Sequence, residues 1–289
     1  MGYFKVLGFN KEPFSTSPDP DFFYLSKEHE IALTNTLIEM HLRRGLTVIL
    51  GDVGTGKTTL SRKLVQELRQ REDYIFYIIL NPSFESEKAF FTALIRGFEI
   101  MPLNGNPLSA MELGESVERF LFQKGVAEDK TVTLIIDEAQ KLNEMSLECL
   151  RLLLNYETNE YKLLQLVLLG QMELHSTIMS IPNFYDRISF KYTLNPLGVK
   201  ETKELIEFRL RQAGFKAKMH LFLDDAVVEI HQQTHGYPRK IIMFCHKILK
   251  ELVMKKKFVV DRRLVRQLAE KEAKLRCSPE DVLLQRSSY

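Results

Sequence analysis

Residues Gly51–Thr59 read GDVGTGKTT and match the pattern G-x-x-x-x-G-K-[ST] at every fixed position. In this pattern the glycines let the backbone take conformations closed to other residues, so that successive N–H groups point inward around a phosphate. Lys57 is expected to place its charge on the β- and γ-phosphates, and the Thr58 hydroxyl to bind Mg²⁺. The residues predicted to surround the phosphates are Gly51, Asp52, Val53, Gly54, Thr55, Gly56, Lys57, Thr58 and Thr59. The sequence therefore predicts a phosphate-binding loop and makes nucleotide binding the first functional hypothesis.

The flanks of this loop favour a true site over a chance glycine-rich turn. Residues 46–50, LTVIL, form an apolar run typical of a short buried strand. From Thr59 to Gln70, apolar residues recur at helical spacing with charged residues between them. A loop between a buried strand and a helix places the positive N-terminal end of that helix at the phosphates.

A second apolar run ends in two carboxylates. Residues 131–138 read TVTLIIDE, so Asp137 and Glu138 follow a predicted buried strand. In a protein with a phosphate loop, such an Asp is a partner of Mg²⁺, and the adjacent Glu can activate water for attack on the γ-phosphate. We therefore predict Asp137 and Thr58 as metal-site residues and Glu138 as the general base.

The composition is that of an ordinary soluble protein, with 289 residues, 45% apolar and 27% charged residues and a net charge of +2. No tract of about 18 apolar residues occurs, so we expect a cytoplasmic protein, either free or peripheral at the inner membrane. The three cysteines are widely spaced, which indicates thiols and neither disulfides nor a zinc site. Residues 239–276 hold 13 Lys and Arg against 4 Asp and Glu, a balance of +9 that fits a solvated helical face or a surface for an acidic partner.

Strands and helices alternate through the first two thirds of the chain. The predicted strands are 46–50, 75–80, 131–136, 163–169 and 189–194. The predicted helices are 59–70, 87–98, 111–124, 142–158, 200–213, 224–234, 238–255 and 260–275, and a turn is expected at 104–107. Such alternation predicts an α/β parallel sheet covered on both faces, followed after about residue 195 by a small all-α domain.

Before the loop, residues 8–33 contain three prolines and an aromatic group formed by Phe14, Phe22, Phe23 and Tyr24. Prolines at positions 13, 18 and 20 exclude regular structure until about Ser26, which can cap the next helix. We expect these aromatic rings to be buried against another group. Two roles stay open for them: contact with a nucleotide base, or attachment of this segment to the protein core.

Together these residues resemble the AAA+ superfamily of ATPases, and within it the ExeA/GspA-like (general secretion pathway protein A) branch. The resemblance rests on GDVGTGKTTL (Walker A), on IIDEAQ at 135–140 (Walker B), on VLLGQ at 167–171, on GYPR at 236–239, and on the leader with Pro13-Phe14, SPDP at 17–20, FYLS at 23–26 and His29. It covers the chain to about residue 275. It implies an ATP- and Mg²⁺-dependent hydrolase that acts as an oligomer with composite sites.

Three further roles follow from the resemblance alone. Gln171 resembles the sensor of the γ-phosphate, and Arg187 the finger that reaches a neighbouring subunit's site. Arg239 resembles the second sensor, in a helical lid. The implied domains are a leader at 1–30 near the nucleotide site, a P-loop AAA+ domain at 31–195, a helical lid at 196–276 and a tail at 277–289.

The sequence departs from the family pattern at two points. Asp186 stands where relatives usually have Gln, and an ion pair with it would hold Arg187 back. Secretion members also continue through a transmembrane helix into a peptidoglycan-binding module, whereas this sequence ends at Tyr289, so we expect a shorter relative or the cytoplasmic part of a longer one.

Two functions remain open at the level of sequence. The first is an ATPase motor or switch with a protein partner in a secretion or envelope assembly system. The second is an ATP-dependent regulator of transposition that binds duplex DNA, which the basic C-terminal region would suit. A scaffold without turnover is disfavoured, because it would need no general base at Glu138.

Overall fold

The computed structural model describes residues 2–16, 22–101, 109–216 and 220–276, and the chain divides into two units. The α/β unit is Lys27–Asn195, and the helical unit combines the residues up to Ser26 with those from Pro196 onward. The expected turn at 104–107, the run at 17–20, Cys277 and the tail lie outside the described residues.

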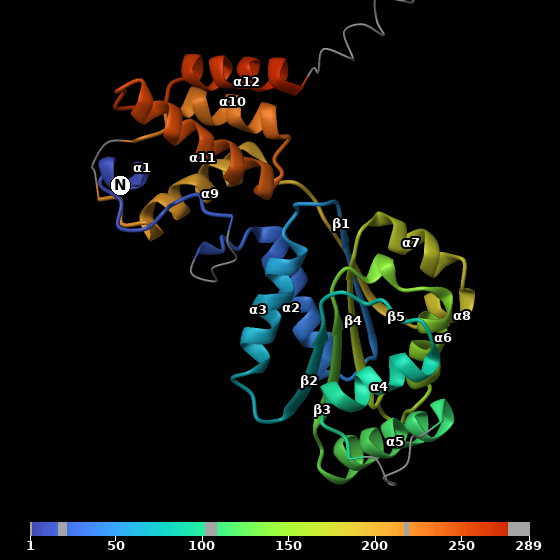
Figure 1. Ribbon diagram of the computed structural model, residues 1–289. Coiled ribbons are helices and arrows are strands. Elements are labelled where there is room, and N and C mark those ends of the chain that lie inside the picture. The colour runs from blue at the N-terminus through green and yellow to red at the C-terminus, as the bar shows by residue number, and fades with distance from the viewer. Residues whose placement is uncertain (1, 17–21, 102–108, 217–219, 277–289) are drawn as a thin grey trace, which may run out of the picture. The chain divides into compact units, whose positions relative to one another are not determined.

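A five-stranded parallel sheet forms the centre of the α/β unit (Figure 1). Its strands are β1 (Leu46–Gly51), β2 (Tyr74–Ile79), β3 (Thr131–Ile136), β4 (Leu164–Gly170) and β5 (Ile188–Leu194). They lie in the order β2-β3-β4-β1-β5, and every neighbouring pair is parallel. The predicted parallel α/β fold is confirmed, and each expected strand is present with ends shifted by at most two residues.

The three central strands are apolar because helices cover both faces of the sheet. Every residue of β1, β3 and β4 is buried. Alternate residues enter two separate cores: Ile49, Ile135 and Val167 lie in one, and Val48 and Leu134 in the other. Figure 1 shows α2 and α3 on the first face and α4, α5 and α6 on the second.

The helices of this unit follow the predicted pattern except that one is shorter and two short ones are additional. They are α2 (Lys27–His41), α3 (Lys57–Leu68), α4 (Glu87–Gly97), α5 (Ala110–Phe122), α6 (Glu144–Leu153), α7 (Met172–Met179) and α8 (Pro182–Tyr185). The helix expected at 142–158 is shorter, because the Asn143 side chain caps its start by accepting from the Ser146 N–H at 2.9 Å. Its end is set by a turn that includes an antiparallel bridge between Glu157 and Lys162 and leads into β4. The short helices α7 and α8 were not expected from the sequence.

The helical unit is built from α1 (Tyr3–Val6), α9 (Val199–Gln212), α10 (Asp224–Thr234), α11 (Pro238–Met254) and α12 (Arg262–Arg276). One apolar core joins them, and it includes Leu205, Ile230, Ile248 and Leu264. Cys245 is buried in the same core, and burial raises the pKa of its thiol.

The N-terminal segment belongs to this core. Phe14 and Phe22 are buried in it and Tyr24 packs against it, so these three rings attach the segment to the helical unit, the second of the two roles considered for the aromatic group. Phe9 is buried in the same core. The expected separate leader at 1–30 therefore differs from the observed division, because the segment up to Ser26 packs within the helical unit while α2 begins at Lys27 in the other.

The guanidinium of Arg209 attaches this N-terminal segment to the helical unit through three hydrogen bonds. Arg209 of α9 donates from Nε to the carbonyl of Pro13 at 2.8 Å, from Nη2 to that of Ser15 at 2.8 Å and from Nη1 to that of Phe22 at 3.3 Å. Its rigid fork of donors suits three carbonyls, two of them in buried hydrogen bonds and that of Ser15 in a partly buried one.

Replacing Arg209 with methionine is expected to lower the free energy of unfolding by about 3 kcal/mol, since three carbonyls lose their donor at about 1 kcal/mol each. Urea unfolding of the full chain measures this, and limited proteolysis should show faster cutting before residue 26. Arg211→Met on the same helix is the control, because the Arg211 side chain is exposed and should contribute at most about 0.5 kcal/mol. Equal stability of the two variants would contradict the prediction.

Candidate functional site

The predicted phosphate loop connects β1 to α3 and has the backbone geometry that its glycines allow. Gly54 and Gly56 have φ values of +90° and +105°. Gly51 is needed for close approach instead, since a Cβ there would lie 2.8 Å from Thr55 Oγ1 and 3.0 Å from the Leu194 carbonyl oxygen. The N-cap of α3 is Gly56, which has no side chain to accept from the first-turn N–H groups. The helix N-terminus can therefore bind an anion.

Lys57 lies inside the loop. It is buried, and its Nζ donates to the carbonyls of Gly51 at 2.6 Å and Asp52 at 3.0 Å. Burial lowers the pKa of Lys57, and the negative charges of Glu138 and Asp137 act against that shift. The amino group thus lies at the centre of the loop, where a phosphate would need a cation.

The sheet order brings the carboxylates of β3 toward the loop. Strand β4 lies between β1 and β3, and all three strands end at the same edge of the sheet. In a parallel sheet this carboxyl edge is where ligands bind. Asp137 and Glu138 after β3, Gln171 after β4 and the loop after β1 therefore share one edge.

Asp137 reaches the first turn of α3. Its side chain is 1% exposed and accepts from the Glu138 N–H at 3.0 Å and from Ser61 Oγ at 3.4 Å. Burial raises the pKa of Asp137, while a hydrogen bond from the Thr58 side chain and those from Glu138 and Ser61 oppose the shift. The structure thus brings together Thr58 and Asp137, the two predicted metal-site residues. Ser61, which the sequence analysis did not single out, joins them.

These donors fit Mg²⁺. A hydroxyl and a carboxylate are hard oxygen ligands, and Mg²⁺ is usually held by one or two carboxylates together with substrate phosphates and water. Among the described residues no group of three His, Cys, Asp or Glu side chains could hold a metal ion.

Glu138 is held in an unusual backbone conformation. Its φ is +54°, in the left-handed region, and a short 3₁₀ turn (Ala139–Lys141) follows it. Its carboxylate Oε2 accepts from Gln140 Nε2 at 2.8 Å. Gln140 Oε1 in turn accepts from the backbone N–H of Gln171 at 3.1 Å. Glu138 and Gln171 are therefore linked through one side-chain amide.

His29 is a further residue at the loop. Its Nε2 lies 2.9 Å from the Thr55 carbonyl oxygen, and because a carbonyl only accepts, this nitrogen carries the proton. A Cβ at position 56 would lie 2.6 Å from the same nitrogen. His29 thus packs directly on the loop backbone. The sequence marked His29 only as part of the family resemblance.

The two predicted arginines lie in different units. Arg187 donates from Nε to the Asn183 carbonyl at 3.0 Å and from Nη1 to the Arg151 carbonyl at 2.9 Å. Within the described part of the chain no ion pair joins it to Asp186. Arg239 is an exposed residue in the first turn of α11, in the helical unit. The finger and sensor roles of Arg187, Arg239 and Gln171 stay predictions.

The sheet order and the loop define a P-loop ATPase of the AAA+ class. A family model described as an AAA domain matches residues 40–178. General secretion pathway protein A of Aeromonas hydrophila is 34% identical over 249 residues, which are 86% of this chain and 44% of that protein. The chain belongs to the ExeA/GspA-like branch of these ATPases. It spans less than half the length of the relative.

Solved structures show the same fold at low sequence identity. Cdc6p from Pyrobaculum aerophilum superposes with a TM-score of 0.66 at 20% identity, covering 90% of this chain and 70% of that one. The Drosophila ORC bound to DNA gives 0.64 at 18% identity, covering 96% and 70%. In the described ranges no helix is both long and apolar enough to span a membrane.

Proposed function

We propose that this protein binds ATP with Mg²⁺ and hydrolyses the γ-phosphate bond. The observation that carries the proposal is the contact of Asp137 with Thr58 and Ser61, which joins the end of β3 to the first turn of the phosphate-loop helix. A phosphate loop alone fits any nucleotide-binding protein. A buried carboxylate fixed against the metal-binding hydroxyl is the arrangement that hydrolysis needs.

The chain's own residues take separate roles in this proposal. The loop N–H groups and Lys57 bind the phosphates, and Thr58 and Asp137 hold Mg²⁺, which neutralises phosphate charge when bound. Glu138 orients the attacking water and accepts its proton. Gln171 contacts the γ-phosphate from the neighbouring strand end, and Arg239 contacts nucleotide from the helical unit acting as a lid.

Arg187 is proposed to act in a neighbouring subunit of a homo-oligomer. Its guanidinium is held by two backbone carbonyls, so both hydrogen bonds must break before it can reach another site. Because such an arginine can contribute about 10³ to 10⁵ in rate, nucleotide turnover would depend on assembly. The protein would then work as an oligomeric motor or switch.

A secretion or envelope assembly system is the process we favour. The support is the match to general secretion pathway protein A, which extends over 86% of this chain and therefore over both units. A protein partner in that system, and a location in the cytoplasm or at the inner face of the inner membrane, are parts of this proposal.

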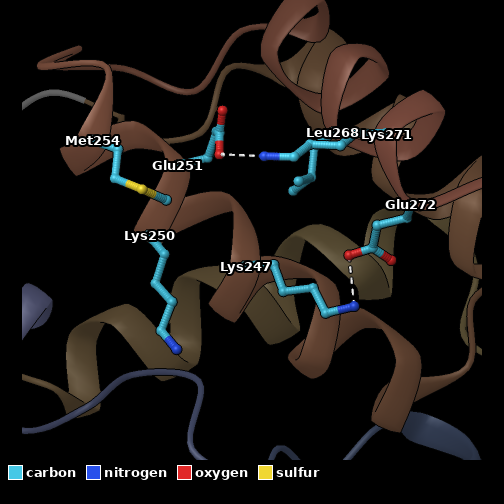
Figure 2. A pocket seen from close by; sticks show the side chains of 7 residues that line it. All are labelled: Lys247, Lys250, Glu251, Met254, Leu268, Lys271 and Glu272. Carbon is cyan, nitrogen blue, oxygen red and sulfur yellow. Dashed lines mark ion pairs between the residues drawn. The ribbon is translucent and has the colours of Figure 1, made fainter. Parts of the chain in front are cut away.

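DNA binding comes second because the charge of the helical unit is partly neutralised within it. Figure 2 shows a pocket between α11 and α12 where Lys247 pairs with Glu272 at 2.6 Å and Lys271 with Glu251 at 4.0 Å. Arg262 and Arg266 both donate to the buried Glu229, each at 2.9 Å. Burial opposes ionisation of Glu229, but the donated hydrogen bonds outweigh it and lower its pKa. These cations are less available to phosphates than their number suggests.

The rate of ATP hydrolysis per subunit, measured against protein concentration, tests the proposal. We expect the rate to rise steeply with concentration. Arg187→Ala should bind ATP with unchanged affinity yet lose about 10³ or more in turnover. Mixing it with Lys57→Ala, which keeps Arg187 but loses its own site, should restore part of the activity. Full turnover by Arg187→Ala alone would exclude the role in trans.

Duplex DNA added at about 50 mM salt, where phosphate contacts are strongest, separates the two processes. Further stimulation of hydrolysis by DNA would move the proposal to the transposition function. A hydrolysis rate that does not change when DNA is added would favour the secretion or envelope function.

A further inference from the structure

Gln140 contacts both Glu138, two residues before it, and Gln171, 31 residues after it in the sequence. Its side-chain amide lies between the Glu138 carboxylate, 2.8 Å from Nε2, and the Gln171 backbone N–H, 3.1 Å from Oε1. Glu138 follows β3, and Gln171 follows β4. The amide therefore spans two adjacent strand ends at the carboxyl edge of the sheet.

The orientation of this amide is fixed by its neighbours. A backbone N–H can only donate, so the oxygen of Gln140 must face Gln171. The amide nitrogen then faces Glu138 and donates to its carboxylate oxygen Oε2. Both bonds have the right polarity in one orientation and the wrong polarity in the other. The Gln140 side chain therefore accepts from the Gln171 N–H and donates to the Glu138 carboxylate.

The backbone of Gln140 packs closely against Gly170 at the end of β4. A Cβ at Gly170 would lie 3.3 Å from the Gln140 backbone nitrogen and 2.6 Å from Leu174 Cδ2. Ala139, one residue before Gln140, is fully buried in the sheet core. The 3₁₀ turn is thus seated tightly against the end of β4, and the left-handed φ of Glu138 leads the chain into it.

We propose that Gln140 is a positioning residue. Its side chain is anchored to the Gln171 N–H at the end of β4 and orients the Glu138 carboxylate. This inference rests on the proposed function, because Glu138 has its role only if the protein hydrolyses nucleotide. Since Gln171 holds the other end of the amide, a shift of the Gln171 backbone moves the carboxylate, and occupancy at the end of β4 is coupled to the position of the base.

The test compares two substitutions that separate the two hydrogen bonds. Gln140→Leu removes both, whereas Gln140→Glu keeps an oxygen for the Gln171 N–H but places a carboxylate against Glu138. If Gln140 only supported the turn, Gln140→Glu would keep the wild-type kcat. We expect both variants to lose about tenfold or more in kcat, with the Kd for ATP within about twofold, because phosphate binding does not involve this amide.

A control and a double variant complete the experiment. Gln123→Leu removes a similar bond, from Gln123 Nε2 to Glu128 Oε1 at 3.3 Å on the exposed surface, and should leave kcat unchanged. In single-turnover assays, adding Gln140→Leu to Glu138→Gln should cause no further loss, since the amide acts through that carboxylate.

These measurements test the roles of Gln140 and Glu138 separately. Wild-type kcat in Gln140→Glu, or a further tenfold loss in the double variant, would overturn the role of Gln140. Wild-type hydrolysis by Glu138→Gln would instead overturn the proposed role of Glu138 itself. If Gln140→Leu fails to fold, as thermal unfolding would reveal, Gln140→Glu carries the test because it preserves the side chain's length and the acceptor.

Discussion

Replacing Lys57 with alanine is expected to abolish ATP binding at micromolar nucleotide. Lys57 is the buried positive charge inside the phosphate loop, and it meets the carbonyls of Gly51 and Asp52. Removing one partner of a buried charge pair, here Lys57 and the bound phosphate, costs about 2–5 kcal/mol, which corresponds to a Kd raised by roughly 1.5 to 3.5 powers of ten. Titration with a fluorescent ATP analogue, checked by calorimetry, measures the loss.

Lys63→Ala supplies the matched control for this variant. Lys63 lies on the same helix, α3, but is partly exposed and pairs with Glu67 at 2.9 Å. A pair of this kind contributes about 0.3–0.5 kcal/mol to helix stability, so ATP affinity should not change. Unchanged ATP affinity in Lys57→Ala would show that the loop does not bind phosphate.

Glu138→Gln is expected to bind ATP and hold it unhydrolysed. The substitution keeps the shape of the side chain and an oxygen for the Gln140 N–H, but it removes the proton acceptor. Loss of a general base costs about 10² to 10⁴ in rate. Single-turnover hydrolysis should slow by that factor, and protein recovered after incubation should contain ATP where the wild type contains ADP.

Glu144→Gln is the control for this prediction. Glu144 is an exposed glutamate that begins α6, six residues after Glu138 and on the same connection. Its removal should leave turnover intact. ADP in the recovered Glu138→Gln protein at the wild-type rate would assign the base to another residue.

Most strands and helices could be predicted because the pattern of apolar residues within each one indicates its type. The runs at 46–50 and 131–136 are apolar without interruption, which only strands buried on both faces require, and both strands are present. The helix expected at 142–158 was too long because no glycine or proline marks the turn after Leu154. The short helices α7 and α8 carry too few residues to show a clear period.

The arrangement of the site could be predicted only in part. Spacing selected Lys57, Thr58 and Asp137, but the position of β4 between β1 and β3 depends on long-range pairing that no local pattern contains. The contacts of His29 with Thr55 and of Gln140 with Gln171 were missed for the same reason. A polar residue with a distant partner has the same sequence signature as one facing solvent.

The division of the helical unit also sets the order in which the protein can fold during synthesis. The residues up to Ser26 are synthesised before the α/β unit, but their core partners begin at Pro196, after it. At a translation rate of about 5–20 residues per second, roughly ten seconds or more pass before those partners exist. Throughout that time Phe9, Phe14 and Phe22 lack the core that buries them. The helical unit can therefore complete its core only after the whole α/β unit has been synthesised, although part of that core precedes the α/β unit in the sequence.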